Sequence, residues 1–157
     1  MAYVSFWYEK LFFDFVIYQS CYRNVFFYQV FMDKMMFQKP LLKNANPIVY
    51  HLTSNDHWRS SIAISDATNL NNLGYNVTLL LSIEGVQVGV KNPHHFLNLD
   101  NVVANVSNFI KDGGKVVVCG VCLRVAGFEP NEIIDGAIIG TDEITPKIFT
   151  NATVVTY

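Results

Sequence analysis

The sequence has little cysteine: its 157 residues contain only Cys21, Cys119 and Cys122. Three thiols are too few, and odd in number, for a disulfide framework of the kind that stabilises small secreted domains. The first residues also lack the pattern of a cleaved secretion signal. We therefore expect a reducing, cytoplasmic setting, in which a cysteine is free to act as a thiol.

An excess of basic residues is also missing. The 11 Lys and Arg residues are outnumbered by 13 Asp and Glu residues, which gives a formal net charge of −2. Proteins that bind nucleic acid carry a basic surface that neutralises phosphates. We therefore expect no nucleic-acid partner.

Glycine is absent from residues 1–46, and proline occurs there only at Pro40, whereas 14 of the 22 aromatic residues lie in this segment. Charged residues interrupt its apolar runs, so no window of about 18 residues is free of charge, as a membrane-spanning helix requires. We therefore expect no membrane-spanning helix in this segment, and a membrane partner is not expected on that ground. The composition separates an aromatic-rich N-terminal extension, residues 1–46, from a domain at residues 47–157.

Three interpretations of the extension remain open. It is an accessory arm that packs on the domain or on a partner, or it precedes a true start at Met32, Met35 or Met36. The third is an interfacial anchor, because aromatic side chains favour the headgroup region of a membrane. Against the anchor, the basic residues of the extension are few and are not gathered on one face.

From residue 47 onward, apolar runs alternate with helical patterns. We predict strands at residues 48–52, 76–81, 116–118, 137–139 and 153–156. We predict helices at residues 56–73 and 141–150 and a short helical turn at 130–134. A further helix should start at Asp100, its N-cap, and end at Asp112-Gly113-Gly114. This alternation predicts a single α/β domain whose mainly parallel five-stranded sheet is flanked by helices on both faces.

Each of the first two predicted helices should turn one apolar stripe toward the sheet. Helical spacing assigns the inward positions to Ala63, Ala67 and Leu70 in the first helix and to Val103, Val106 and Ile110 in the second. Between the second strand and the second helix, residues 82–99 have no clear periodicity and are predicted to form a long loop. Loops of that length are often functional.

Cys119 and Cys122 follow a strand without polar alternation, Val116-Val117-Val118, which is typical of a buried parallel strand. Cys119 is therefore placed at the carboxyl end of the strand, where ligand crevices form in open parallel sheets. Free backbone N–H groups and the positive end of a helix dipole would favour its thiolate form. Gly120 would allow close approach to this thiol, and Arg124 would lend it positive charge.

Zinc binding and thioredoxin-like chemistry fit this C-x-x-C less well. A structural zinc site needs four ligands, and the sequence has no second C-x-x-C or H-x-x-x-H to complete one. A thioredoxin-like dithiol lacks its usual context, an aromatic residue before the motif and a proline within it. Both thiols could instead be small buried hydrophobes, which suits Cys122 better than Cys119.

The loop at residues 82–99 supplies further candidates for a site. It contains Glu84-Gly85-Val86 and the adjacent His94 and His95. The histidines could meet Cys119 in space as a base or as metal ligands, or they could be exposed residues without a role. We place Gly85, His94 and His95, together with Gly120 and Arg124, in a candidate pocket beside the thiols and predict no metal centre.

Four segments resemble the DsrE/DsrF/YchN-like family of small sulfur-relay proteins, to which TusD-like proteins belong: residues 49–54 (VYHLTS), Gly85-Val86, residues 118–123 (VCGVCL) with Gly127, and residues 134–137 (IDGA). The resemblance covers residues 47–157. It implies a subunit of trimers or hexamers, homo-oligomeric or assembled with homologous subunits, that exchanges sulfur with a TusA-like carrier protein and uses no cofactor. It also implies that Cys119, with a glycine eight residues later, accepts sulfane sulfur as a persulfide.

Two functional hypotheses follow. The first is a sulfurtransferase-type sulfur carrier that acts through Cys119, with Cys122 in a secondary role as a resolving thiol. The second is a non-catalytic ligand-binding or assembly subunit of the same fold. The chain is an enzyme only if the first hypothesis holds.

Overall fold

The computed structural model describes residues 45–157, which form five strands, four α-helices and three short 3₁₀-helices. In chain order these are β1 (Ile48–Leu52), α2 (His57–Asn72), β2 (Val77–Leu81), η1 (Ile83–Gly89), η2 (His95–Leu97), α3 (Asp100–Lys111), β3 (Lys115–Cys119), α4 (Gly120–Val125), η3 (Pro130–Glu132), β4 (Ile138–Gly140), α5 (Ile144–Phe149) and β5 (Thr153–Thr156). All but two residues of the predicted N-terminal extension, 1–46, lie outside the described residues, so its role stays a prediction.

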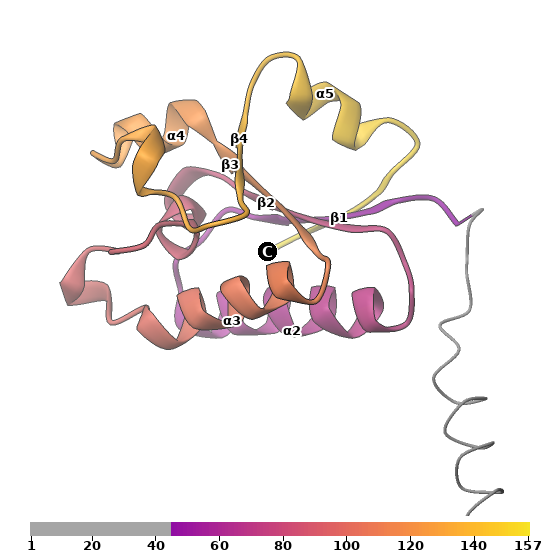
Figure 1. Cartoon of the computed structure of the whole chain (residues 1–157), viewed down its shortest axis with the longest axis horizontal. Coiled ribbons are helices and arrows are strands. Elements are labelled where there is room, and N and C mark those ends of the chain that lie inside the picture. Colours follow the sequence, from indigo (N-terminus) through magenta and orange to yellow (C-terminus); the bar gives the residue numbers. More distant parts are fainter. Residues whose placement is uncertain (1–44) are drawn as a thin grey trace, which may run out of the picture. The chain divides into compact units, whose positions relative to one another are not determined.

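The five strands form one parallel sheet in the order β4-β3-β2-β1-β5. Helices α2 and α3 cover one face of this sheet, and α5 covers the other (Figure 1). Helix α4 follows the carboxyl end of β3, contacts η1 and adds Leu123 to the core of α2 and α3. The predicted α/β domain, with a five-stranded parallel sheet between helices, is confirmed.

The central strands are buried because both of their faces are covered. All five residues of β2 are buried, as the run without polar alternation in a parallel sheet predicts. Leu79, Leu81 and Val118 belong to a large core beneath α2 and α3, while Leu80 and Val117 belong to a small core that packs against α5. Alternate residues of one strand therefore enter different cores.

Helix α2 begins where the sequence predicts. The carboxylate of Asp56 accepts hydrogen bonds from the backbone N–H groups of Trp58 and Arg59, which satisfies two free donors of the first turn. On the inward stripe, Ala63 and Ala67 are fully buried. These small side chains let the helix lie close to the sheet.

The predicted stripe of α3 is correct at Val106 and wrong at its other two positions. The buried residues are Val102, Val106 and Phe109, while Val103 and Ile110 are only partly buried. Both sets follow helical spacing and share Val106, and the centres of the two stripes differ by about 70° around the helix. The apolar face of α3 is broad, and Phe109 at its centre lies against Gly114, whose missing side chain leaves room for the ring.

The prediction of a long loop at residues 82–99 is also wrong. Residues 83–89 form η1 and residues 95–97 form η2, and Val86, Val88 and Val90 are fully buried. The segment thus adds to the core. It has no helical or strand period because a 3₁₀-helix repeats every three residues.

Within residues 45–157, each helix is too short or too polar to cross a bilayer.

Candidate functional site

The two thiols of the C-x-x-C lie in direct contact at the carboxyl end of β3. Cys119 is the last residue of β3 and the N-cap of α4, and its Sγ accepts a hydrogen bond from the backbone N–H of Cys122 at 3.3 Å. The Cys122 Sγ lies 2.6 Å from the Cys119 Sγ and donates to it. Both cysteines are free thiols and are partly buried. A cysteine thus occupies the capping position that Ser, Thr or Asp usually fills.

The two sulfurs differ in hydrogen bonding: Cys122 is the donor and Cys119 is the acceptor. Burial raises the pKa of the Cys122 thiol, and its hydrogen bond to Cys119 acts in the same direction, while a backbone hydrogen bond from Ile83 opposes them. Cys122 therefore keeps its proton and donates it toward Cys119. The Cys119 sulfur receives both an N–H and an S–H from Cys122, an arrangement that suits a thiolate acceptor.

Gly127, eight residues after Cys119, ends helix α4. Its φ of 85° lies in the left-handed region that glycine adopts readily. The N–H of Gly127 bonds to the carbonyl of Arg124, and the N–H of Phe128 bonds to that of Leu123, the two bonds of a Schellman motif. Leu123 and Phe128 are buried in the large core. The glycine thus fixes the length of α4 and anchors the helix that begins at Cys119.

A pocket of about 410 Å³ opens beside the thiols, between η1 and α4. Its lining is mostly apolar and consists of Asn55, Ile83, Glu84, Gln87, Val121, Cys122, Val125 and Ala126. Cys122 faces this pocket, and Cys119 lies directly behind it. Pockets of this size accommodate small organic molecules.

The backbone of Ile83, at the mouth of this pocket, has an unusual conformation. Its φ is 53°, in the left-handed region, which is rare for a β-branched residue and costs about 1–3 kcal/mol. In this conformation the backbone of Ile83 acts to lower the pKa of the Cys122 thiol, and the Ile83 side chain remains 61% exposed. Backbone strain is therefore stored at the residue that contacts the second thiol.

Sequence reasoning missed a second polar pair at the same edge of the sheet. The Nε2 of His51 lies 2.6 Å from the Oγ of Ser82, the residue that follows β2. Burial lowers the pKa of His51. The pairing of Leu81 with Val118 makes Ser82 and Cys119 the next neighbours along β2 and β3. The only available signal was the position of these residues at the carboxyl ends of adjacent parallel strands.

Gly85 and Gly120 both allow close backbone packing. A Cβ on Gly85 would lie 2.4 Å from the carbonyl oxygen of Leu52, and a Cβ on Gly120 would lie 2.9 Å from the Cγ2 of Ile139 in β4. Neither glycine lines the pocket. Gly85 seats η1 on the end of β1, and Gly120 seats the start of α4 on β4.

The other predicted pocket residues lie outside the lining. Arg124 is exposed on α4, and His95 is exposed in η2. The Nδ1 of His94 accepts a hydrogen bond from the Nε2 of Gln87 at 3.0 Å, and its ring stacks on Phe128 at 4.9 Å between ring centroids. His94 thus supports a pocket residue from behind. Among residues 45–157, no three His, Cys, Asp or Glu side chains are grouped to hold a metal ion.

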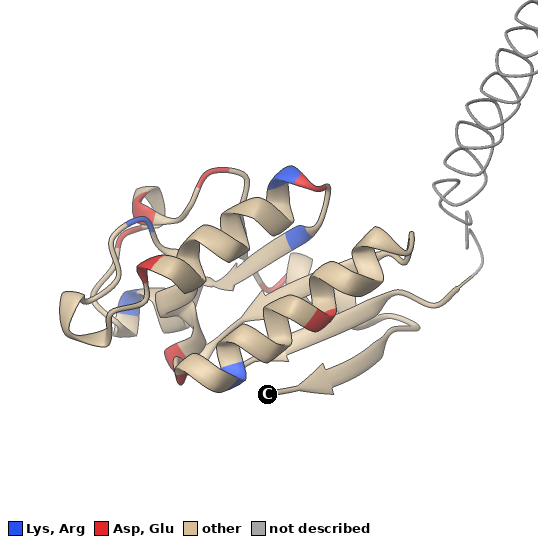
Figure 2. Cartoon of the chain, turned by 90° about the horizontal axis from the view of Figure 1, so that it is seen from below, with Lys and Arg blue, Asp and Glu red and all other residues tan. Residues whose placement is uncertain are grey.

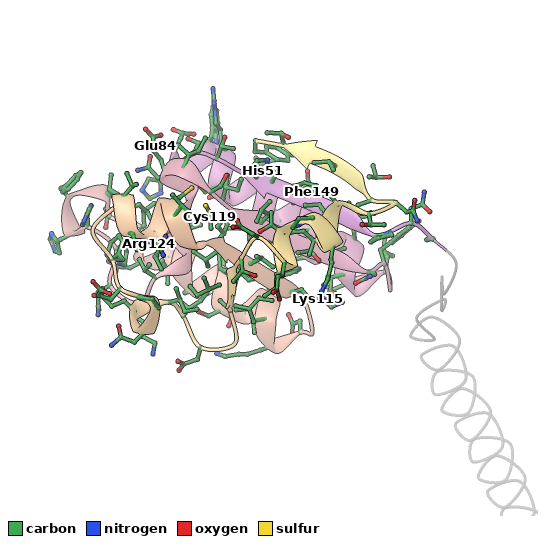
Figure 3. All side chains as sticks on the ribbon, turned by 90° about the horizontal axis from the view of Figure 1, so that it is seen from above. His51, Glu84, Lys115, Cys119, Arg124 and Phe149 are labelled. Carbon is green, nitrogen blue, oxygen red and sulfur yellow. The ribbon has the colours of Figure 1, made fainter. Side chains whose placement is uncertain are left out.

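Charged side chains are few at the pocket and scattered elsewhere in the described chain. The Lys and Arg residues of the described chain are spread over several elements and do not gather on one face (Figure 2). Glu84 and Cys119 lie at one end of the sheet, whereas Lys115, at the start of β3, lies at the other (Figure 3). Of the pocket-lining residues, all within the described chain, only Glu84 carries a charge.

Comparison with solved structures supports the fold. The chain is similar to the YchN protein from E. coli, with 18% identity, a TM-score of 0.59, and coverage of 71% of this chain and 98% of YchN. It is also similar to MTH1491 from Methanobacterium thermoautotrophicum, a protein of unknown function, with 17% identity, a TM-score of 0.55, and coverage of 72% and 100%. A search of curated protein sequences found no significant match. The family model described as "DsrE/DsrF-like family" matches residues 48–157, and the chain therefore belongs to that family.

Proposed function

We propose that this chain is a sulfur-relay protein that accepts sulfane sulfur on Cys119 as a persulfide and passes it to a partner carrier. The observation that carries the proposal is the pair of hydrogen bonds that Cys119 Sγ accepts from the N–H and S–H of Cys122, at the wall of an apolar pocket. Membership of a family with a sulfur-relay fold supports the same conclusion.

In the loading step, the Cys119 thiolate attacks the terminal sulfur of a donor persulfide, R–S–SH. A bond forms between that sulfur and Cys119 Sγ, the donor S–S bond breaks, and the donor leaves as the thiolate RS⁻. Cys122 faces the pocket as a protonated thiol, so its S–H can stabilise the leaving thiolate. In the unloading step, an acceptor thiolate attacks the terminal sulfur of the Cys119 persulfide, and the Cys119 thiolate is regenerated.

Cys122 could also act as a resolving thiol. Its thiolate would attack the Cys119 Sγ of the persulfide, which forms a disulfide and releases hydrosulfide. The sulfurs are already in contact, so geometry does not prevent this reaction. The raised pKa of Cys122 does oppose it, because the thiol is a poor nucleophile. We therefore assign Cys122 the secondary role, with Cys119 as the sulfur acceptor.

A relay protein needs a partner that can reach the persulfide. Ile83, Val121 and Val125 are 61%, 62% and 84% exposed around the mouth of the pocket, an apolar surface suited to a protein contact. We propose a TusA-like carrier as the acceptor, and a trimer or hexamer, with itself or with homologous subunits, as the assembly.

Intact-mass analysis tests the proposal. The wild-type protein, incubated with an organic persulfide and freed of excess donor, should gain the mass of one sulfur atom. Cys119→Ser should lose this gain. The matched variant Cys122→Ser should keep most of it, because the substitution changes only the side chain and the backbone N–H of residue 122 still donates to Cys119. Full loading of Cys119→Ser would refute the assignment.

The size and apolar lining of the pocket also favour a second function, in which the chain is a non-catalytic ligand-binding or assembly subunit. In that case neither cysteine would gain sulfur. Both would then be alkylated slowly at neutral pH, as partly buried thiols are. Rapid alkylation of Cys119 alone would favour the relay.

A further inference from the structure

Glu84 is the single charged residue that lines the pocket within the described chain. Its side chain is exposed at the first turn of η1 and shares the lining with the thiol of Cys122. The walls on either side are apolar, formed by Ile83 from η1 and by Val121 and Val125 from α4. A molecule that reaches the thiols through this pocket therefore passes a carboxylate.

No cationic side chain of the described residues lines the pocket to offset this charge. Arg124 is on α4, but it is exposed and is not one of the residues that line the pocket. The neutral amide of Gln87 forms hydrogen bonds with His94 and does not offset the charge of Glu84. A doubly charged inorganic anion such as thiosulfate or tetrathionate would find no counterion here.

We propose that Glu84 determines which sulfur donors the site accepts: it favours aliphatic persulfides with a positive charge at their carbon end over anionic donors. This inference rests on the sulfur-relay function proposed above. The alkyl part of such a donor contacts the apolar walls, its cation pairs with Glu84, and its terminal sulfur reaches the thiols. The volume of about 410 Å³ accommodates a donor of this size.

The sulfur transfer itself is unchanged by the charge of the donor. Cys119 Sγ bonds to the terminal sulfur, the donor S–S bond breaks, and the donor thiol leaves with the bonding electron pair. No outside oxidant or reductant is required, because the sulfane sulfur moves from one thiolate to another. Glu84 acts only on the approach and seating of the donor.

Two donors of similar length and opposite charge test the proposal: the persulfides of cysteamine, which is cationic, and of mercaptopropionate, which is anionic. At low salt, the ratio of the loading rates of the cationic and anionic donors should be about fivefold or more higher for the wild-type protein than for Glu84→Gln, which is the scale of one charge pair near 4 Å in water. Comparing variants cancels the intrinsic difference between the donors, whose leaving thiols differ in acidity. High salt should reduce the difference. Glu84→Lys should lower this ratio further than Glu84→Gln does. Glu143→Gln, which removes one negative charge outside the pocket, should preserve the wild-type ratio.

The outcomes separate this inference from the function on which it rests. If neither donor loads Cys119, the relay function fails and the selectivity fails with it. If Glu84→Gln keeps the wild-type ratio, the selectivity is refuted and the relay function stands. A ratio that changes equally in Glu84→Gln and Glu143→Gln would assign the effect to net charge and would also refute the role of Glu84.

Discussion

Replacing Gly85 by alanine should break the support beneath the pocket. The new Cβ would lie 2.4 Å from the carbonyl oxygen of Leu52, about 1 Å closer than ordinary van der Waals contact. That oxygen belongs to β1, which pairs with β2 on one side and with β5 on the other, so it cannot move away. It also accepts the hydrogen bond of the Ser82 N–H. The segment that starts η1 must therefore move.

The cost follows from this displacement. Overpacking of a well-ordered site costs about 1–3 kcal/mol. The shift would also weaken the hydrogen bonds from the N–H groups of Ser82 to Leu52 and of Gly85 to Thr53, each worth about 1 kcal/mol. We expect Gly85→Ala to lower the free energy of unfolding by about 2–4 kcal/mol.

Urea unfolding measured by circular dichroism checks this value. Gly113→Ala is the matched control, because Gly113 has a φ of 89° but a Cβ added there would meet no atom within 4 Å, so it should cost only about 1 kcal/mol. Since η1 carries Ile83 and Glu84, Gly85→Ala should also alter the alkylation rate of the thiols, whereas Gly113→Ala should not. A loss below 1 kcal/mol for Gly85→Ala, or equal losses for the two variants, would contradict the reasoning.

Two further predictions concern pH. Burial lowers the pKa of His51 in the folded state, so the contribution of His51 to stability is complete above its unfolded pKa of about 6.5 and is lost as the pH falls through the folded pKa. When thermal unfolding is measured between about pH 8 and pH 5, the melting temperature should therefore fall less for His51→Asn than for the wild type. A hydrogen bond to Asp66 raises the pKa of Tyr157 to about 12, so stability should fall between the unfolded value of 10.0 and about 12; in an ultraviolet titration of the phenolate, Asp66→Asn should move this transition to lower pH, and an unchanged transition would contradict the assignment.

Much of the fold could be predicted from the sequence because regular elements carry a period. The strand at Ile48–Leu52 and the closing strand at Thr153–Thr156 are predicted residue for residue, and the start of α2 is predicted from the capping carboxylate of Asp56. These features are local: a run of β-branched residues or one capping side chain defines each. Broad apolar faces are harder, since Val102 and Val103 in α3 are both apolar and only packing decides between them.

The pocket could not be predicted, because tertiary contacts create it. Asn55, Glu84 and Val125 come from three separate segments, and no spacing in the sequence relates them. The predicted loop at residues 82–99 obscured them further, since a loop would leave Gln87 in solvent, whereas it is 6% exposed and bonded to His94. The resemblance to a family indicated the thiols and left their surroundings undetermined.

Sequence and structure single out different thiols of the C-x-x-C. Sequence reasoning favours Cys119 because it ends a parallel strand, and the structure places Cys122, the secondary thiol, at the pocket wall. The two findings agree if access and reactivity are divided between the residues. Cys122 faces the pocket and stays protonated, since burial raises its pKa, while Cys119 behind it accepts two hydrogen bonds. If Cys119 is the sulfur acceptor that we propose, a donor reaches it past a protonated thiol and a carboxylate and must fit the pocket to react, whereas a single exposed thiolate would react with any electrophile.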